Sequence, residues 1–221
     1  MSEQSIHRAI VMDTSSINAL LKYFKFKNST HYTALCNFFA DKIMCGEIII
    51  LDKVYTELVG TKKINRDTEF KRIIVPLLGI KGDICDTTNI PILFSTLNRT
   101  NEIEGYIEDY YIKENEEHFF KHIINEKELK EAIAIERAKY ITEYADLYLI
   151  DTCFVLQKDK NNEVLLITEE NKVGDGKLVK KIPTICLAEH IEYHHLPYLL
   201  YNLYESEIEF IFNRKSKEEN T

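Results

Sequence analysis

The sequence lacks a long apolar run, a paired-cysteine motif and an excess of positive charge. No apolar run approaches the roughly 18 residues needed to cross a bilayer, so we expect a soluble globular protein that is not integral to a membrane. The five cysteines are an odd number without CxxC spacing, and the N-terminus does not resemble a signal peptide. These features favour free thiols in a reducing cytoplasm. Because the net charge of -8 repels nucleic acid, any nucleic-acid function must depend on a local site.

Short apolar segments alternate with helix-like segments along the chain. Two runs, 48–51 and 164–167, are continuously apolar and predict strands that are buried on both faces. A further strand is expected over 8–13, and the segment 182–186, which contains a proline, is expected to be an edge strand. The alternation of strands with helices is typical of a parallel sheet in an α/β fold.

The length of 221 residues and the hydrophobic content of 45% are sufficient to bury a core as one domain, which we place at 5–213. Within it, 62–140 is expected to be a mainly helical insertion, because 102–143 is charged and carries apolar residues at helical spacing. This insertion is the most acidic part of the chain, which argues against a nucleic-acid surface there. The charged tail 214–221 is expected to be disordered.

One short stretch is the starting point for the candidate chemistry. The apolar run 10–12 ends at Asp13, which is followed by three hydroxyl residues, Thr14, Ser15 and Ser16. This pattern predicts a buried parallel strand that stops at Asp13, with a hydroxyl side chain able to cap the following helix. In an open α/β sheet, binding sites form at the carboxyl ends of the strands.

Three further carboxylates fall at comparable positions. Glu57 lies in the first turns of the helix after the second strand, Asp146 near the start of a late apolar helix, and Glu170 just beyond a later strand. If adjacent strands carry these elements, the acids converge, and two carboxylates about 4 Å apart repel by roughly 4 kcal/mol. Such a cluster must take up protons or hold a cation, and Mg²⁺ or Mn²⁺ is the natural occupant. The reaction that suits this arrangement is hydrolysis of a phosphodiester.

Neighbouring residues are candidates for supporting roles. Asp151 lies about 140° around the helix from the third acid, which makes it a spare acid rather than a partner on the same face. Glu169 competes with Glu170, because successive strand residues point to opposite faces, and the register favours Glu170. Lys172 and Lys177 follow the fourth acid and are placed to contact the phosphate backbone of an RNA, with a solvated loop as the alternative.

Four segments resemble the four signatures of PIN-domain nucleases. They are Asp-Thr-Ser-Ser from residue 13, Val-Tyr-Thr-Glu-Leu from residue 54, Ala-Asp-Leu-Tyr-Leu-Ile-Asp-Thr from residue 145 and Leu-Ile-Thr-Glu-Glu from residue 166. The Thr-Glu-Glu ending, followed by a Lys-Ile-Pro…Cys segment, is similar to one branch of bacterial toxin candidates in this superfamily. The resemblance covers roughly 8–62 and 140–190.

The resemblance implies a fold, an activity and partners. It places the catalytic, metal-binding acids of the family at four positions: Asp13, Glu57, Asp146 and Glu170. Thr14 or Ser15 corresponds to the hydroxyl that orients the first acid. The implied fold is three-layered, with a parallel sheet of four or five strands flanked by helices. The implied protein is a Mg²⁺- or Mn²⁺-dependent ribonuclease that cleaves RNA internally and that can be the toxin of a toxin-antitoxin pair. In that case an antitoxin would cover the acidic groove, and the chain would form a homodimer.

Two other functions remain open from the sequence. The first is a catalytically inactive PIN-like module that binds RNA or a protein partner, with the long insertion as its interface. The second is a phosphoryl-transfer enzyme with Asp13 as nucleophile, which the sequence favours less. The haloacid-dehalogenase pattern needs an Asp two positions after the nucleophile, where this chain has Ser15, and there is no glycine-rich phosphate loop.

Overall fold

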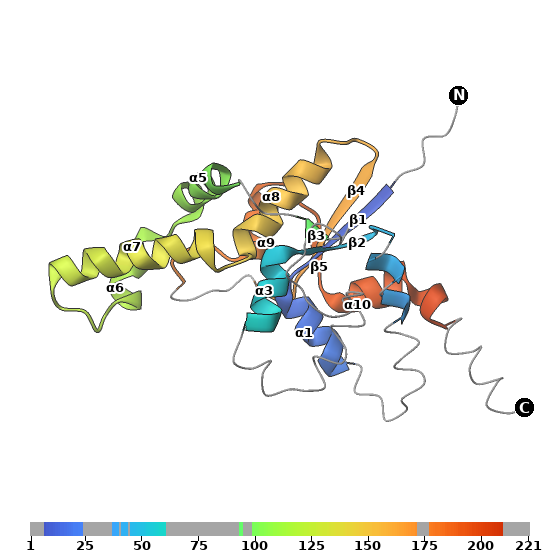
Figure 1. The fold of residues 1–221 in the computed structure, drawn as a ribbon, viewed down its shortest axis with the longest axis horizontal. Coiled ribbons are helices and arrows are strands. Elements are labelled where there is room, and N and C mark those ends of the chain that lie inside the picture. Colours follow the sequence, from blue (N-terminus) through green and yellow to red (C-terminus); the bar gives the residue numbers. More distant parts are fainter. Residues whose placement is uncertain are drawn as a thin grey trace, which may run out of the picture.

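The structure is a computed structural model that describes residues 7–23, 37–39, 41–43, 45–60, 93–94, 99–171 and 177–209. Its centre is a five-stranded sheet with the strand order β3-β2-β1-β4-β5 (Figure 1). Every strand pair is parallel. The strands are β1 (His7–Met12), β2 (Ile48–Leu51), β3 (Leu93–Phe94), β4 (Asn162–Ile167) and β5 (Tyr193–His194). The predicted α/β fold with a parallel sheet is therefore confirmed.

Helices flank the sheet on both sides. They are α1 (Thr14–Tyr23), α3 (Asp52–Gly60), α5 (Thr100–Tyr110), α6 (Glu116–Phe119), α7 (Glu126–Thr142), α8 (Asp146–Gln157), α9 (Ile182–Ala188) and α10 (Leu196–Tyr198). Helix α8 packs against β1 and β4, and α5 and α9 pack on α8. In Figure 1, α8 lies above the sheet, while α1 and α10 lie below it. No helix in the described part of the chain is both long and apolar enough to cross a membrane.

The core is formed by the central strands and α8. The side chains of Ile10, Val11, Leu166 and Ile167 have no exposed surface or almost none. In α8, every residue over 147–153 is buried. A helix is apolar on all sides when protein covers it on all sides, and here the cover comes from the sheet, α5 and α9. This packing places the first residue of α8 beside the carboxyl ends of β1 and β4.

The segment 62–140, predicted to be a mainly helical insertion, is mostly helical over its described residues from 99 onward, and residues 93–94 form the short strand β3. It contains α5, α6 and α7, and Figure 1 shows α7 extending away from the sheet. We call the segment 99–142 the helical arm. The other part of the predicted insertion, apart from β3, lies outside the described residues, as does the tail 214–221.

The prediction of an edge strand over 182–186 is wrong, because this segment begins helix α9. Pro183 lies in the first turn of the helix, where its missing N–H would have no partner in any case. The place beside β4 is taken by β5, which pairs with it in parallel. Three cysteines, Cys45, Cys153 and Cys186, are free thiols.

Candidate active site

The carboxyl ends of β1 and β4 lie side by side in the middle of the sheet. The chain passes from β1 to β2 and β3 on one side and then to β4 and β5 on the other. The strand order therefore reverses between β1 and β4, and ligands of open α/β sheets bind outside the carboxyl ends at such a point. Asp13 directly follows β1, and Thr168 directly follows β4.

Asp13 is held by both strands and is only 4% exposed. Its backbone N–H donates to the carbonyl of Ile167 at 2.9 Å, and its own carbonyl accepts from the N–H of Ser16 at the start of α1. Its carboxylate atom Oδ2 accepts hydrogen bonds from the Ser15 hydroxyl and, at 2.9 Å, from the Thr168 hydroxyl. Ser15 is thus the hydroxyl residue that orients the first acid.

Glu57 connects three helices. Its Oε2 accepts a hydrogen bond from the Thr14 hydroxyl in α1, and its Oε1 accepts one from the N–H of Ala145 at 2.7 Å. Ala145 is the N-cap residue of α8, so Glu57 satisfies one of the free N–H groups at the beginning of that helix. This contact brings α3 to the helix that starts with Asp146.

Asp146 is the first residue of α8 and is half-buried. Among the described residues, its carboxylate has no hydrogen-bond or ion-pair partner. Its pKa is raised to about 8, first by burial and then by the negative charges of Asp13, Glu170 and Glu57, while the charge of the exposed Lys177 lowers it. All four predicted acids therefore belong to one electrostatic cluster.

The pKa of Asp13 is also raised, to about 6. Burial is the largest cause, and the charges of Glu170 and Glu57 add to it. The hydrogen bonds from Ser15 and Thr168 act in the opposite direction, because they stabilise the ionised form. The cluster thus holds more negative charge than its surroundings compensate.

The structure separates the two neighbouring glutamates after β4. The carboxylate of Glu170 accepts from the N–H of Ile182 at the start of α9 and from the Lys181 ammonium, both at 3.4 Å. The carboxylate of Glu169 instead accepts from the N–H of Leu196 at 2.6 Å, at the start of α10. Of the two glutamates, Glu170 is the one whose charge raises the pKa of Asp13 and of Asp146.

Asp151 is not part of the cluster. It is 4% exposed and forms a two-pronged ion pair with Arg99, with 2.7 Å from Nε to Oδ2 and 2.6 Å from Nη2 to Oδ1. Arg99 lies 52 residues before Asp151, and nothing in the local sequence indicated this pairing. The other lysine predicted to meet RNA, Lys172, lies outside the described residues.

Thr168 is a site residue that was not predicted from the sequence. Its side chain is fully buried, donates to Asp13 and accepts from the backbone N–H of Glu170 at 3.1 Å. It therefore links the acid after β1 to the acid after β4. The available signal was a hydroxyl residue directly after the predicted strand 164–167, within the signature Leu-Ile-Thr-Glu-Glu.

Comparison of the chain with known protein families, with curated proteins and with solved structures finds no match.

The carboxylate oxygens of the cluster are ligands of the type that a hard divalent cation prefers. In the described part of the chain, no three acidic, histidine or cysteine side chains are grouped closely enough to form a ready metal site. Mg²⁺, however, keeps several waters and commonly uses one or two protein carboxylates. Asp146, which has no hydrogen-bond donor among the described residues, and the neighbouring Asp13 meet that requirement, while Glu57 and Glu170 keep their contacts to the beginnings of α8 and α9.

Proposed function

We propose that the protein is a metal-dependent phosphodiester hydrolase of the PIN type that acts as an endoribonuclease. One observation carries the proposal: four elements that are distant in the sequence bring four carboxylates to the switch point of the sheet, where they raise the pKa of Asp13 and Asp146. Uncompensated negative charge on oxygen donors favours binding of a divalent cation. The resemblance to PIN signatures involves the same four positions.

The residues have distinct roles in this proposal. Asp13 and Asp146 would hold Mg²⁺ or Mn²⁺, and the ion would supply Lewis-acid stabilisation of charge on the phosphoryl oxygens. The hydroxyls of Ser15 and Thr168 keep the Asp13 carboxylate in place and favour its ionised form. The exposed Lys177, whose charge acts on Asp146, meets a phosphate of the RNA.

The resemblance to bacterial toxin candidates extends the proposal to a biological role. In that role the protein is a cytoplasmic toxin, an antitoxin protein covers the acidic edge of the sheet, and two copies of the chain associate as a homodimer. Expression of the active protein without its antitoxin then arrests growth, and expression of an inactive variant does not.

A second candidate is a catalytically inactive PIN-like module that binds RNA or a protein partner. It is favoured by the hydrogen bonds that Asp13, Glu57 and Glu170 already accept from hydroxyl and N–H groups of the protein. These partners reduce the need for a cation, because they stabilise the carboxylates directly. The two candidates differ in one measurable property, which is cleavage of RNA.

The deciding experiment is RNA cleavage by the purified full chain with Mg²⁺, Mn²⁺ or EDTA. Single-stranded RNA should be cut with either metal and remain intact with EDTA. Asp13→Asn and Asp146→Asn should each abolish cleavage, whereas Asp109→Asn, which removes an exposed carboxylate of α5, should leave it unchanged. Cleavage that persists in both site variants would contradict the proposal, and metal-independent RNA binding without cleavage would support the inactive module.

A further inference from the structure

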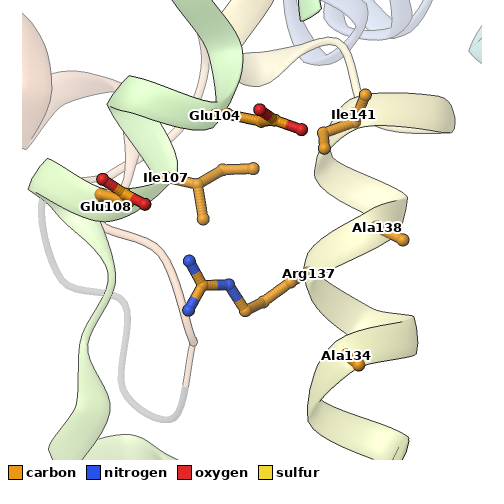
Figure 2. A pocket seen from close by; sticks show the side chains of 7 residues that line it. All are labelled: Glu104, Ile107, Glu108, Ala134, Arg137, Ala138 and Ile141. Atoms are coloured by element: carbon orange, nitrogen blue, oxygen red, sulfur yellow. The ribbon is translucent and has the colours of Figure 1, made fainter. Parts of the chain in front are cut away.

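A groove of about 370 Å³ opens between α5 and α7 of the helical arm (Figure 2). Seven residues line it: Glu104, Ile107, Glu108, Ala134, Arg137, Ala138 and Ile141. None of the four acids of the candidate active site is among them. The groove is therefore a separate feature of the molecule, and no part of the proposed hydrolase function uses it.

One part of the lining is apolar and shallow. Ile107 is buried on the α5 side, and Ile141 is half-buried on the α7 side. Ala134 and Ala138, one helical turn apart on α7, are exposed. Because alanine side chains are small, they leave room for the apolar side chains of another molecule to pack against the helix.

Helix α7 has little cover from the rest of the protein. It is 17 residues long, and Tyr140 is its only buried residue. Two large apolar residues of the arm are strongly exposed: Ile135 on α7 at 61%, and Ile124 in the preceding turn at 98%. A surface helix normally buries an apolar stripe, and exposed apolar surface of this kind often marks an interaction site.

The charges of the groove indicate which occupant fits. Glu104 and Glu108 lie one turn apart on α5, and neither forms an ion pair with a described residue. Figure 2 shows the Arg137 side chain reaching from α7 toward α5 within the groove, and its guanidinium lies over the Tyr111 ring at 5.0 Å. The helical arm as a whole carries eleven acidic and seven basic residues. The two carboxylates therefore attract a cation, and the arm repels an acidic partner.

We propose that this groove binds a basic, amphipathic helix of a partner protein. The apolar side chains of that helix pack on Ala134, Ala138 and Ile141, and its Lys or Arg side chains pair with Glu104 and Glu108, which is the helix-in-groove mode of recognition. Because Arg137 reaches into the groove, the positive side chains of the bound helix contact the exposed carboxylates of Glu104 and Glu108 from the solvent side. This binding site is independent of RNA cleavage.

The test uses two synthetic peptides and fluorescence anisotropy with the full chain. A helical Leu/Lys peptide is the probe, and a Leu/Glu peptide with the same apolar spacing is its counterpart. The Leu/Lys peptide should bind in the micromolar range and the Leu/Glu peptide should not bind. The double substitution Glu104→Gln with Glu108→Gln should raise the Kd of the Leu/Lys peptide at least tenfold.

A matched control distinguishes binding of the peptide in the groove from its general attraction to an acidic protein. Glu128→Gln with Glu131→Gln removes the same charge from exposed positions of α7 outside the groove lining and should change the Kd less than twofold. Ala138→Trp fills the groove at an exposed position and should abolish binding, with circular dichroism used to verify the fold. Equal effects of the two double substitutions, binding that survives Ala138→Trp, or equal binding of both peptides would overturn the proposal.

Discussion

A single residue of the site, Asp146, makes the stability of the folded protein depend on pH. Its pKa rises from the ordinary value of 3.8 to about 8, so the folded protein holds a proton there in a pH range where the unfolded chain has lost it. The free energy of unfolding therefore decreases as the pH rises from about 4 to about 8, and above that range the full destabilisation is present. Asp13, whose pKa rises to about 6, acts in the same direction over a narrower range.

We expect Asp146→Asn to remove most of this dependence on pH. In the presence of EDTA, the variant should be more stable than the wild type at pH 9, by an amount on the order of a few kcal/mol, and should differ little near pH 4. Urea unfolding at pH 4, 6 and 9 measures the difference. The same slope of stability against pH in both proteins would show that Asp146 is not the destabilising group.

Thr168 shows that a residue can organise the cluster without being an acid. Its hydroxyl donates a hydrogen bond to the Asp13 carboxylate and accepts one from the backbone N–H of Glu170. One buried group therefore links the two acids that follow β1 and β4. This role needs the parallel register of β1 and β4, which pairs Met12 with Ile167 and brings the two following residues together.

At the scale of elements, the ion pair between Arg99 and Asp151 attaches the helical arm to the core. Arg99 is the N-cap residue of α5, and Asp151 lies in the fully covered part of α8. A buried carboxylate that loses its partner destabilises a protein strongly, whereas replacement of both partners by apolar residues is tolerated. Lys53 makes a second connection, because its ammonium donates to the carbonyls of Ile141 and Thr142 at the end of α7, at 2.9 and 2.7 Å.

We expect Arg99→Leu to lower the free energy of unfolding by about 3 kcal/mol, because Asp151 remains buried and unpaired. The double variant Arg99→Leu with Asp151→Leu should recover most of that loss. Urea unfolding of the single and double variants measures the coupling between the two residues. If the double variant loses as much free energy of unfolding as the single variant, or more, the pair does not stabilise the protein in this way. As a control, Arg99→Leu should bind divalent cations as the wild type does.

At the scale of the whole molecule, the net charge of -8 and the acid cluster have a common consequence, which is a preference for cations over polyanions. We expect Mn²⁺ to stabilise the wild type by about 2.7 kcal/mol when its concentration is one hundred times its Kd. Thermal unfolding with and without Mn²⁺ measures this effect. Asp13→Asn and Asp146→Asn should each remove most of it, and equal stabilisation of Asp109→Asn and the wild type is the matching control.

The fold was largely predictable from the sequence, and its exceptions have local causes. The continuously apolar runs correctly indicated β2 and β4, because strands covered on both faces need no polar alternation. The segment 182–186 has a similar composition but begins a helix, because its proline suits a first helical turn and β5 occupies the sheet edge. Apolar composition alone does not distinguish these outcomes.

The local sequence was enough to predict the strands β1, β2 and β4 and to place Asp13, Glu57, Asp146 and Glu170 near the ends of strands or the beginnings of helices, although it did not predict that 182–186 begins helix α9. It could do so because apolar runs and capping residues are local properties of the chain. The partners of the carboxylates follow from the packing of distant elements: Glu169 contacts the start of α10, Asp151 pairs with Arg99, and Asp146 has no hydrogen-bond donor within the part of the chain that the structure describes. These outcomes depend on which distant elements pack together, and a partner 52 residues away leaves no trace in the neighbouring sequence.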